Sequence, residues 1–158
     1  MKKNIVLLAF TSILLGACAQ QQPIKPSVPP VAGIAVDDHA KSIQELKQGV
    51  SIYFDKNATQ VESRYEMYLI AAAQVLKNNP RMSLKVDGHT DSTGSRATNL
   101  RVSMNRANSV RMRLIGEYNV NANQLLAAGL GPNYPIADNS TEEGRAKNRR
   151  VTLTLQSN

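Results

Sequence analysis

The sequence is poor in the residues that most often build metal, nucleotide and nucleic-acid sites. Its 158 residues include one cysteine, two histidines, two phenylalanines and no tryptophan. Cys18, His39 and His89 are too few for a metal-ligand set, so we predict no metal site and no cofactor. The glycine-rich turns lack the Lys-Ser or Lys-Thr signature of a phosphate loop. So few large aromatic rings leave little surface for stacking bases, and we expect no nucleic-acid partner.

The apolar run at the amino terminus is too short to cross a bilayer. It covers residues 5–15, about eleven residues, and follows Lys2 and Lys3, as in the positive start and apolar core of a secretory signal peptide. Small residues then lead to Cys18, the one cysteine of the chain. We therefore predict a signal peptide at residues 1–17.

The segment Leu15-Gly16-Ala17-Cys18 resembles the lipobox of bacterial lipoproteins. In a lipobox the cysteine takes a diacylglycerol and the chain is cleaved just before it, so Cys18 is the expected lipidation site. The alternative is an ordinary signal peptide with a chance cysteine, which would leave a lone thiol in an oxidising compartment. Ala19 replaces the aspartate associated with inner-membrane retention. By analogy, we expect a lipid anchor in the outer membrane and a domain facing the periplasm.

Charge and composition point to one basic domain. With 42% hydrophobic and 20% charged residues, the chain can fold as a single domain of ordinary size. The formal net charge is +7, or +5 once Lys2 and Lys3 are removed with the signal peptide. This excess favours anionic lipid, nucleic acid or an anionic cell-wall polymer as a partner. Nucleic acid is the least accessible of the three to a secreted chain.

Residues 18–48 are predicted to link the lipid to the domain. Four prolines within residues 23–30 exclude a helix and favour an extended, semi-rigid spacer. At ~3.1 Å per residue, residues 19–36 would reach on the order of 50–60 Å. Asp37 is a candidate cap for a short helix that ends near Gln48.

Residues 49–158 are predicted to form the domain, and they contain no internal repeat. Apolar spacing predicts the following elements in chain order: a strand at 50–54, a helix at 60–78, a strand at 82–86, a polar loop at 88–95, a helix at 96–117, a strand at 124–129, one or two helical turns at 141–147 and a strand at 150–155. Strands that alternate with helices indicate an α/β (α+β) sandwich of the βαβαβ type. We expect a mixed, partly parallel sheet of about four strands, covered by helices on one face.

The polar loop at 88–95 is the strongest candidate for a binding site. It lies between the carboxyl end of a strand and the amino end of a helix, where α/β folds commonly bind ligands. Free N–H groups at the helix start favour a carboxylate, and Asp91 offers a site for an ammonium group.

Arg106 lies on the predicted apolar stripe of the following helix, midway between Val102 and Val110. A charged group there must reach solvent or find a partner. A structural ion pair with Asp91 or another acid is as good an interpretation as a ligand contact. Arg113 also falls near the edge of the stripe, so helical position does not single out Arg106. We expect two other arginines of the helix to be solvated, Arg101 and Arg111.

Several motifs follow one another in order from about residue 50 to 155: Tyr53-Phe54-Asp55, Gly88-His89-Thr90-Asp91, Gly94-Ser95, Asn99, Ser103, Arg106-Ala107, Val110, Pro135-Ile136-Ala137 and Asn148-Arg149-Arg150-Val151. Together they resemble the OmpA C-terminal domain family, to which the peptidoglycan-associated lipoproteins belong. The resemblance implies non-covalent binding of peptidoglycan through the diaminopimelate of its stem peptide. Val102 departs from the usual leucine, a change that we expect to alter only core packing.

The resemblance also assigns roles to particular residues. Asp91 and Arg106 are implied to hold the two ends of diaminopimelate, an acid for its ammonium and a guanidinium for its carboxylate. Supporting positions of the pocket are implied for four further residues: Asn57, Thr90, Asn99 and Arg149.

Two functional classes remain open, and neither is enzymatic. The first is a module that tethers the outer membrane to the cell wall. The second is a scaffold or interaction subunit of a larger envelope machine, such as a Tol-type or secretion complex. His89 and Asp91 lack a serine in a nucleophile context, so we interpret His89 as structural.

Overall fold

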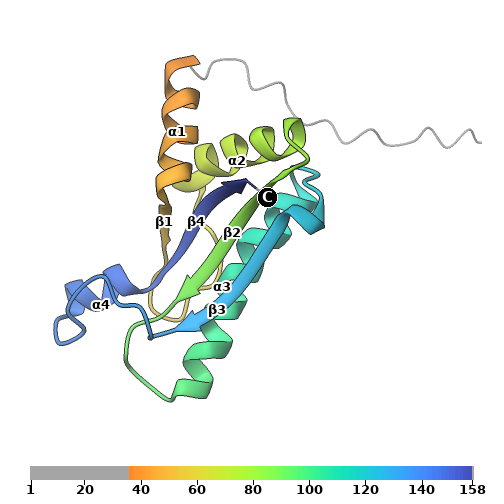
Figure 1. Cartoon of the computed structure of the whole chain (residues 1–158). Helices are drawn as coiled ribbons and strands as arrows, with labels where there is room; N and C mark the ends of the chain where they lie inside the picture. The colour runs from red at the N-terminus through yellow and green to blue at the C-terminus, as the bar shows by residue number, and fades with distance from the viewer. Residues whose placement is uncertain (1–35, 158) are drawn as a thin grey trace, which may run out of the picture.

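The computed structural model describes residues 36–157, and Figure 1 shows their arrangement. The predicted signal peptide, Cys18 and the proline-rich tether lie outside the described residues. The elements are α1 (Val36–Gln48), β1 (Val50–Tyr53), the 3₁₀ turn η1 (Ser63–Tyr65), α2 (Glu66–Asn78), β2 (Met82–His89), α3 (Arg96–Gly116), the 3₁₀ turn η2 (Ala122–Gln124), β3 (Leu125–Gly131), α4 (Glu142–Asn148) and β4 (Arg150–Ser157).

The four strands form one mixed sheet in the order β1-β4-β2-β3. β4 pairs antiparallel with both β1 and β2, whereas β2 and β3 are parallel. The parallel pair brings the carboxyl ends of β2 and β3 to the same edge, where the polar loop begins. The predicted α/β fold with a partly parallel sheet of four strands is confirmed.

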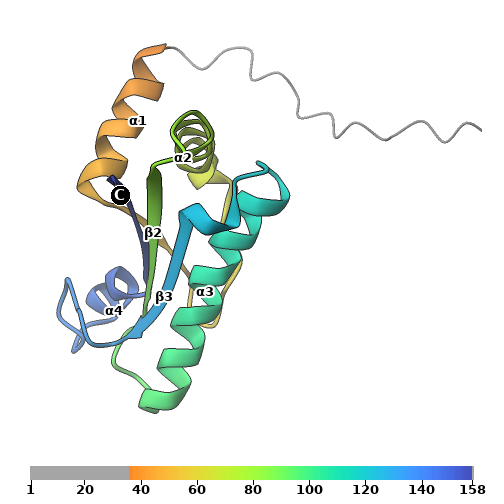
Figure 2. The ribbon, with the colours of Figure 1, turned by 45° about the vertical axis from the view of Figure 1, so that its right-hand side comes forward.

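Alternating side chains give the sheet two different faces. Leu84 and Val86 of β2 are fully buried under the helices, while Lys85 between them is exposed. Figure 2 shows α2 and α3 on one side of the sheet, and α1 packs against α2 and β4. The core between these layers is made of apolar residues from every large element, among them Leu46, Ile52, Leu69, Leu76, Leu84, Val110, Leu114 and Leu153.

The second strand ends later than the sequence predicted, and Gly88 lies within it. The sequence predicted that Gly88 would end it, but β2 continues to His89, so the loop starts only at Thr90. A Cβ on Gly88 would lie 2.0 Å from the carbonyl oxygen of Ser103 in α3. The glycine therefore allows close contact between strand and helix rather than a turn.

The helix predicted at 60–78 was too long at its amino end. A 3₁₀ turn occupies residues 63–65, and α2 begins only at Glu66. The Tyr65 hydroxyl accepts a hydrogen bond from the Tyr53 backbone N–H at 3.1 Å, which fixes this turn to the end of β1. A tertiary contact thus overrides a helical pattern. The predicted short helix is present as α1 and ends at Gln48, but Asp37 lies within the helix and is not its cap.

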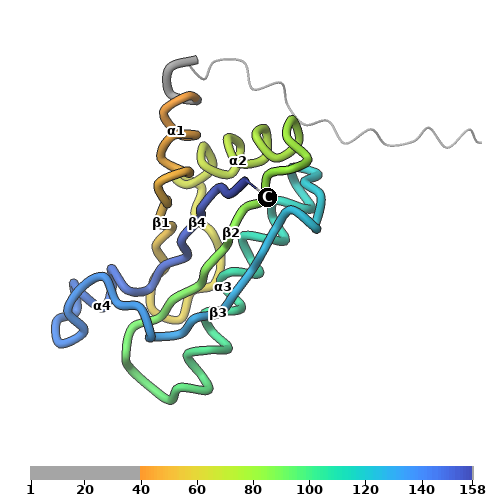
Figure 3. The backbone as a smooth tube through the Cα atoms, viewed as in Figure 1, coloured from red at the N-terminus to blue at the C-terminus, as the bar shows by residue number. Residues whose placement is uncertain are grey.

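The segment between β3 and β4 lies on the far side of β2 from α3. Figures 1 and 3 show α4 and its flanking loops beside the start of β4. Asn148 holds this segment together, because its side chain accepts from the N–H groups of Ile136 and Ala137 and donates to the carbonyl of Ala137. As a result, the backbone next to Arg149 is fixed in position.

Candidate functional site

The loop from Thr90 to Ser95 is held at both ends. At its start, the Thr90 N–H donates to the carbonyl of Gly131 at the end of β3, at 3.0 Å. At its end, the Ser95 side chain caps α3 by accepting from the Thr98 N–H at 3.1 Å. In the middle, the Ser92 N–H donates to Asn139 Oδ1 in the segment before α4. The loop that carries Asp91 is therefore fixed in position.

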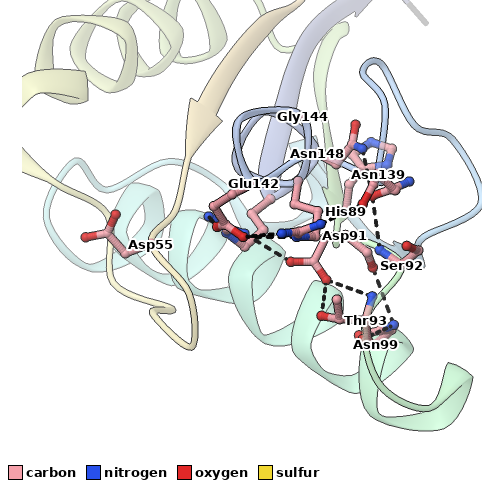
Figure 4. Close-up of polar contacts among 12 residues, drawn as sticks. Asp55, His89, Asp91, Ser92, Thr93, Asn99, Asn139, Glu142, Gly144 and Asn148 are labelled. Carbon is pink, nitrogen blue, oxygen red and sulfur yellow. Dashed lines mark hydrogen bonds and ion pairs between the residues drawn. The ribbon is translucent and has the colours of Figure 1, made fainter.

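Asp91 is buried and almost fully hydrogen bonded, with a relative exposure of 6%. Its Oδ1 accepts from the Thr93 N–H at 2.9 Å and from the Thr93 hydroxyl, and its Oδ2 accepts from Arg149 Nη1 at 3.1 Å (Figure 4). Burial raises the pKa of Asp91, but the hydrogen bonds from Thr93 and the charge of Arg149 outweigh it and leave that pKa below its usual range. Asp91 is therefore an anion at neutral pH, with one acceptor position still open.

Asn99 fixes the loop from the first turns of α3. Its Nδ2 donates to the carbonyls of Thr93 at 2.9 Å and Asp91 at 3.4 Å. These bonds hold the backbone on both sides of Ser92. The residue thus positions the loop that presents the Asp91 carboxylate.

Arg106 has a relative exposure of 2%, yet among the described residues no carboxylate lies within 4.0 Å of it. Its donors meet three backbone carbonyls: Nε meets Ala58 at 2.9 Å, Nη1 meets His89 at 3.3 Å and Nη2 meets Asp55 at 3.1 Å. The guanidinium also lies over the Phe54 ring, 5.2 Å from its centre. Dipoles orient the arginine, but its full charge remains without a counter-ion.

The pKa of Arg106 reflects its burial without a counter-ion. Burial, together with the positive charge of Arg149, lowers the pKa of Arg106 to about 10, although Asp91 opposes the shift. Arg106 is therefore still a cation at neutral pH. The structural ion pair that the sequence left open is not formed by Arg106, because Asp91 pairs with Arg149 instead.

Arg149 joins two acids at the α4 side of the site. Its Nη1 contacts Asp91, and its Nη2 donates to Glu142 Oε1 at 3.0 Å. The Arg149 side chain is 9% exposed, whereas that of Glu142 is 63% exposed. Sequence reasoning assigned Arg149 only a supporting role and missed Glu142, which is 51 positions from Asp91 in the chain and has no motif around it.

These side chains surround a hollow of about 220 Å³. All six residues singled out from the sequence line it: Asn57, Thr90, Asp91, Asn99, Arg106 and Arg149. The structure adds five lining residues that the sequence did not single out for this role: Lys56, Thr93, Gly94, Thr98 and Val102. Thr93 and Gly94 belong to the predicted polar loop, so the loop itself was the signal for them. Val102, whose change from the usual leucine was expected to alter only core packing, also lines the pocket.

Two supporting residues have unusual local features. Asn57 adopts a left-handed backbone conformation with φ of 65° at the turn after β1, which few residues other than glycine and asparagine do. Thr90 is buried, and its hydroxyl has no partner among the described residues. Both residues therefore place polar groups at the wall of the hollow.

The pocket combines both signs of charge with a positive excess. Lys56, Arg106 and Arg149 line it together with one carboxylate, Asp91. A ligand that carries an ammonium group and at least one carboxylate matches this pattern. The pocket lining contains no histidine, cysteine or serine.

Three predictions about residues outside the pocket can be compared with the structure. His89 is 4% exposed, and its ring meets the edge of Tyr134 with the centroids 6.4 Å apart. Arg101 is exposed as expected. Arg111 was expected to be solvated but is partly buried, because its guanidinium lies beside the carbonyls of Leu125 and Ala122, both at 3.4 Å.

Within residues 36–157, no three metal-ligating acidic, histidine or cysteine side chains come together. The same part of the chain contains no helix with the length and apolar character of a membrane span. Both findings leave the amino-terminal 35 residues out of account.

A family model described as the OmpA family matches residues 53–149, which include every residue of the pocket. The chain belongs to the OmpA family. Among curated relatives of this OmpA-family chain is the outer membrane protein Omp38 of Acinetobacter baumannii, 37% identical over 153 residues. That alignment covers 96% of this chain but 43% of Omp38, so the chain spans less than half of that relative.

Solved structures share the same fold. The peptidoglycan-associated lipoprotein of Burkholderia pseudomallei is 35% identical, with a TM-score of 0.64, and the match covers 67% of this chain and 89% of that one. The cell wall anchor of the T6SS from Pseudomonas aeruginosa is 27% identical, with a TM-score of 0.57 and coverages of 70% and 81%. The predicted membership of the OmpA-like, peptidoglycan-associated lipoprotein group is confirmed.

Proposed function

We propose that this chain is an outer-membrane lipoprotein that binds peptidoglycan non-covalently and so tethers the membrane to the cell wall. The ligand group is the diaminopimelate of the stem peptide, whose side chain ends in an ammonium group and a carboxylate. A buried Arg106 without a counter-ion beside the Asp91 anion is the observation that supports this proposal most strongly.

Each charged group of the ligand has a complementary partner. The carboxylate binds Arg106, whose backbone contacts use only three of its five N–H groups. The ammonium binds the open acceptor position of Asp91. An uncharged side chain would leave the buried Arg106 without a counter-ion and the last acceptor position of Asp91 unfilled, which disfavours stems that lack either charge.

The remaining parts of the proposal come from the amino terminus and from the relatives. Cys18 carries the lipid, residues 19–35 span the gap to the wall, and the domain faces the periplasm. We propose binding without catalysis, since the pocket lining offers neither a serine or cysteine nucleophile nor a histidine base to activate one. The named relatives are an outer membrane protein, a peptidoglycan-associated lipoprotein and a cell wall anchor, which agrees with a wall-binding role.

Co-sedimentation with purified sacculi tests the proposal. The mature domain should pellet with sacculi that contain diaminopimelate and much less with sacculi that contain lysine at that position. Asp91→Ala and Asp91→Asn should each weaken binding by about ten-fold or more, because the ammonium loses its counter-ion. Arg101→Ala, on the exposed side of α3, should bind like the wild type.

The second candidate is a scaffold subunit of an envelope machine, favoured by the structural match to the T6SS anchor. The same experiment separates the two candidates. No binding of the wild type to sacculi would contradict the wall-binding proposal and would leave protein partners as the remaining interpretation of this surface. Equal binding of the wild type and Asp91→Ala would contradict only the role of Asp91 in holding diaminopimelate.

A further inference from the structure

We propose that Glu142, outside the pocket, determines how strongly the pocket selects a ligand with an ammonium group. It does so by sharing Arg149 with Asp91. The inference rests on the proposed function, because it concerns the charge of the carboxylate that binds the ammonium. It makes Glu142 a specificity-determining, positioning residue and not a ligand contact.

The geometry divides the donors of one guanidinium between two acids. Arg149 donates from Nη1 to Asp91 Oδ2 at 3.1 Å and from Nη2 to Glu142 Oε1 at 3.0 Å. Figure 4 labels the two acids, Asp91 and Glu142. An arginine beside a single carboxylate commonly donates two parallel hydrogen bonds to it. With Glu142 present, Asp91 receives only one hydrogen bond from Arg149.

The division matters because Asp91 has few acceptor positions left. Its Oδ1 is used twice by Thr93, and Oδ2 is used once by Arg149. A carboxylate has about four acceptor positions, so one remains for a ligand ammonium. A second bond from Arg149 to Oδ2 would fill that position and would bring the guanidinium closer to the carboxylate, which weakens its attraction for the ammonium.

Asp91 and Arg149 interact strongly because both side chains are buried. Asp91 and Arg149 have side chains only 8% and 9% exposed, so their interaction is poorly screened by water. Glu142 lies at the solvent side, 63% exposed, and it also pairs with Arg145 at 2.9 Å. Hydrogen bonds from Arg145 and Arg149 keep the pKa of Glu142 below its usual range, so it stays charged at neutral pH. An exposed acid thus modulates a buried one through a shared cation.

The neighbouring residue provides a matched control. Glu143 follows Glu142 in the first turn of α4, but its carboxylate pairs with Lys147 at 2.7 Å, and neither residue lines the pocket. Removal of either acid takes one negative charge from the same turn of the same helix. Only the removal of Glu142 frees Arg149.

The test compares two synthetic tripeptides by titration calorimetry. One ends in meso-diaminopimelate and the other in 2-aminopimelate, which keeps the side-chain carboxylate but lacks the ammonium. The wild-type domain should prefer the first. Glu142→Ala should reduce the ratio of the two affinities by about five-fold, because Arg149 then turns to Asp91. Glu143→Ala should leave the ratio unchanged.

A merely structural role of Glu142 would give a different result. Loosening of α4 would weaken both peptides equally and preserve their ratio, which would overturn the inference alone. Glu142→Gln keeps an acceptor oxygen for Arg149 Nη2 but removes the charge, so it should reduce the ratio less than Glu142→Ala does. If the wild type did not distinguish the two peptides, the pairing of Asp91 with an ammonium would be wrong, and this inference would fall with the proposed function.

Discussion

Two hollows along α3 each have an arginine in their wall, and they differ in how its charge is balanced. The larger, of about 550 Å³, includes Arg113, which pairs with Glu66 and with Glu117. The smaller, of about 220 Å³, includes the ion-paired Arg149 and also Arg106, whose hydrogen bonds go only to backbone carbonyls. Arg106 and Arg113 are seven positions apart, so they lie on the same side of the helix.

Neither the volume of a hollow nor the helical position of its arginine identifies the proposed binding site. Arg113 is satisfied by the protein itself, and its pKa is raised by the hydrogen bond that it donates to Glu117 and by the charges of both acids, despite some burial. Arg106 has a lowered pKa because it is buried without an acid of its own. A cation that the fold leaves uncompensated is the group available to a ligand.

The largest expected difference concerns two glycines, Gly88 at the contact of β2 with α3 and Gly116 in the lining of the larger hollow. In Gly88→Ala the new Cβ would meet the α3 backbone at 2.0 Å, so we expect a loss of about 3 kcal/mol or more in the free energy of unfolding. In Gly116→Ala, at the Arg113 end, nothing lies within 4 Å, so we expect a gain of about 0.5–1 kcal/mol. Urea unfolding of both variants measures the contrast. Equal stabilities would show that α3 does not depend on its close contact with β2.

Acid should lower the free energy of unfolding by protonating His89, which lies near Arg106 because its carbonyl accepts a hydrogen bond from that residue. Burial, reinforced by Arg150, lowers the pKa of His89 to about 4, although Asp87 opposes the shift. Between pH 6.5 and 4 the unfolded state binds the proton more readily, so stability falls as the pH falls through this window. The loss should approach about 3 kcal/mol in the wild type. His89→Asn should lose less, and unfolding curves from pH 7 to 4 that ran parallel for both proteins would contradict this.

Substitution of the two arginines separates binding from stability. Arg106→Met should weaken binding of the diaminopimelate tripeptide by about thirty-fold, because the ligand carboxylate loses its counter-ion. Arg113→Met should leave binding within about two-fold but lower the free energy of unfolding by about 1–2 kcal/mol. Calorimetry and urea unfolding measure the two effects. Circular dichroism verifies that Arg106→Met is folded, and Arg106→Lys, which keeps the charge, should bind between the two.

The smallest effect is expected at the solvent edge of the Arg113 hollow. Glu117 is 56% exposed and shares Arg113 with Glu66. Glu117→Gln should therefore change the free energy of unfolding by less than about 0.5 kcal/mol and leave tripeptide binding unchanged. A clear loss of binding in this variant would mean that the two hollows are coupled and that Arg113 and its acids also affect the ligand.

Most of the fold was predictable because its signals are local. Alternation along β2 and β4 and helical spacing along α3 placed these elements to within a few residues. The errors came where a distant contact decided the outcome. Gly88 reads as a strand end but sits against Ser103, and the expected helix start gave way to a turn fixed by Tyr65.

The site was predictable in its members but not in its connections. Motif resemblance supplied Asp91, Arg106 and the supporting residues, and all of them line one hollow. It did not show that Asp91 pairs with Arg149, because an arginine 58 positions away can meet many acids. Glu142 and Lys56 had no signal in the sequence, since exposed charged residues are common in any chain.

The sequence by itself determined the signal-like amino terminus, the Cys18 motif, the order of the elements and the residue types of the pocket, because each depends on neighbouring residues or on a motif. Only the tertiary structure decided which charges cancel. Arg106 and Arg113 have the same side chain on the same face of one helix, but electrostatic energy depends on distance through space. Folding brings two acids to Arg113, which forms structural ion pairs with both, but brings only carbonyls within hydrogen-bond distance of Arg106, which leaves its charge for the proposed ligand.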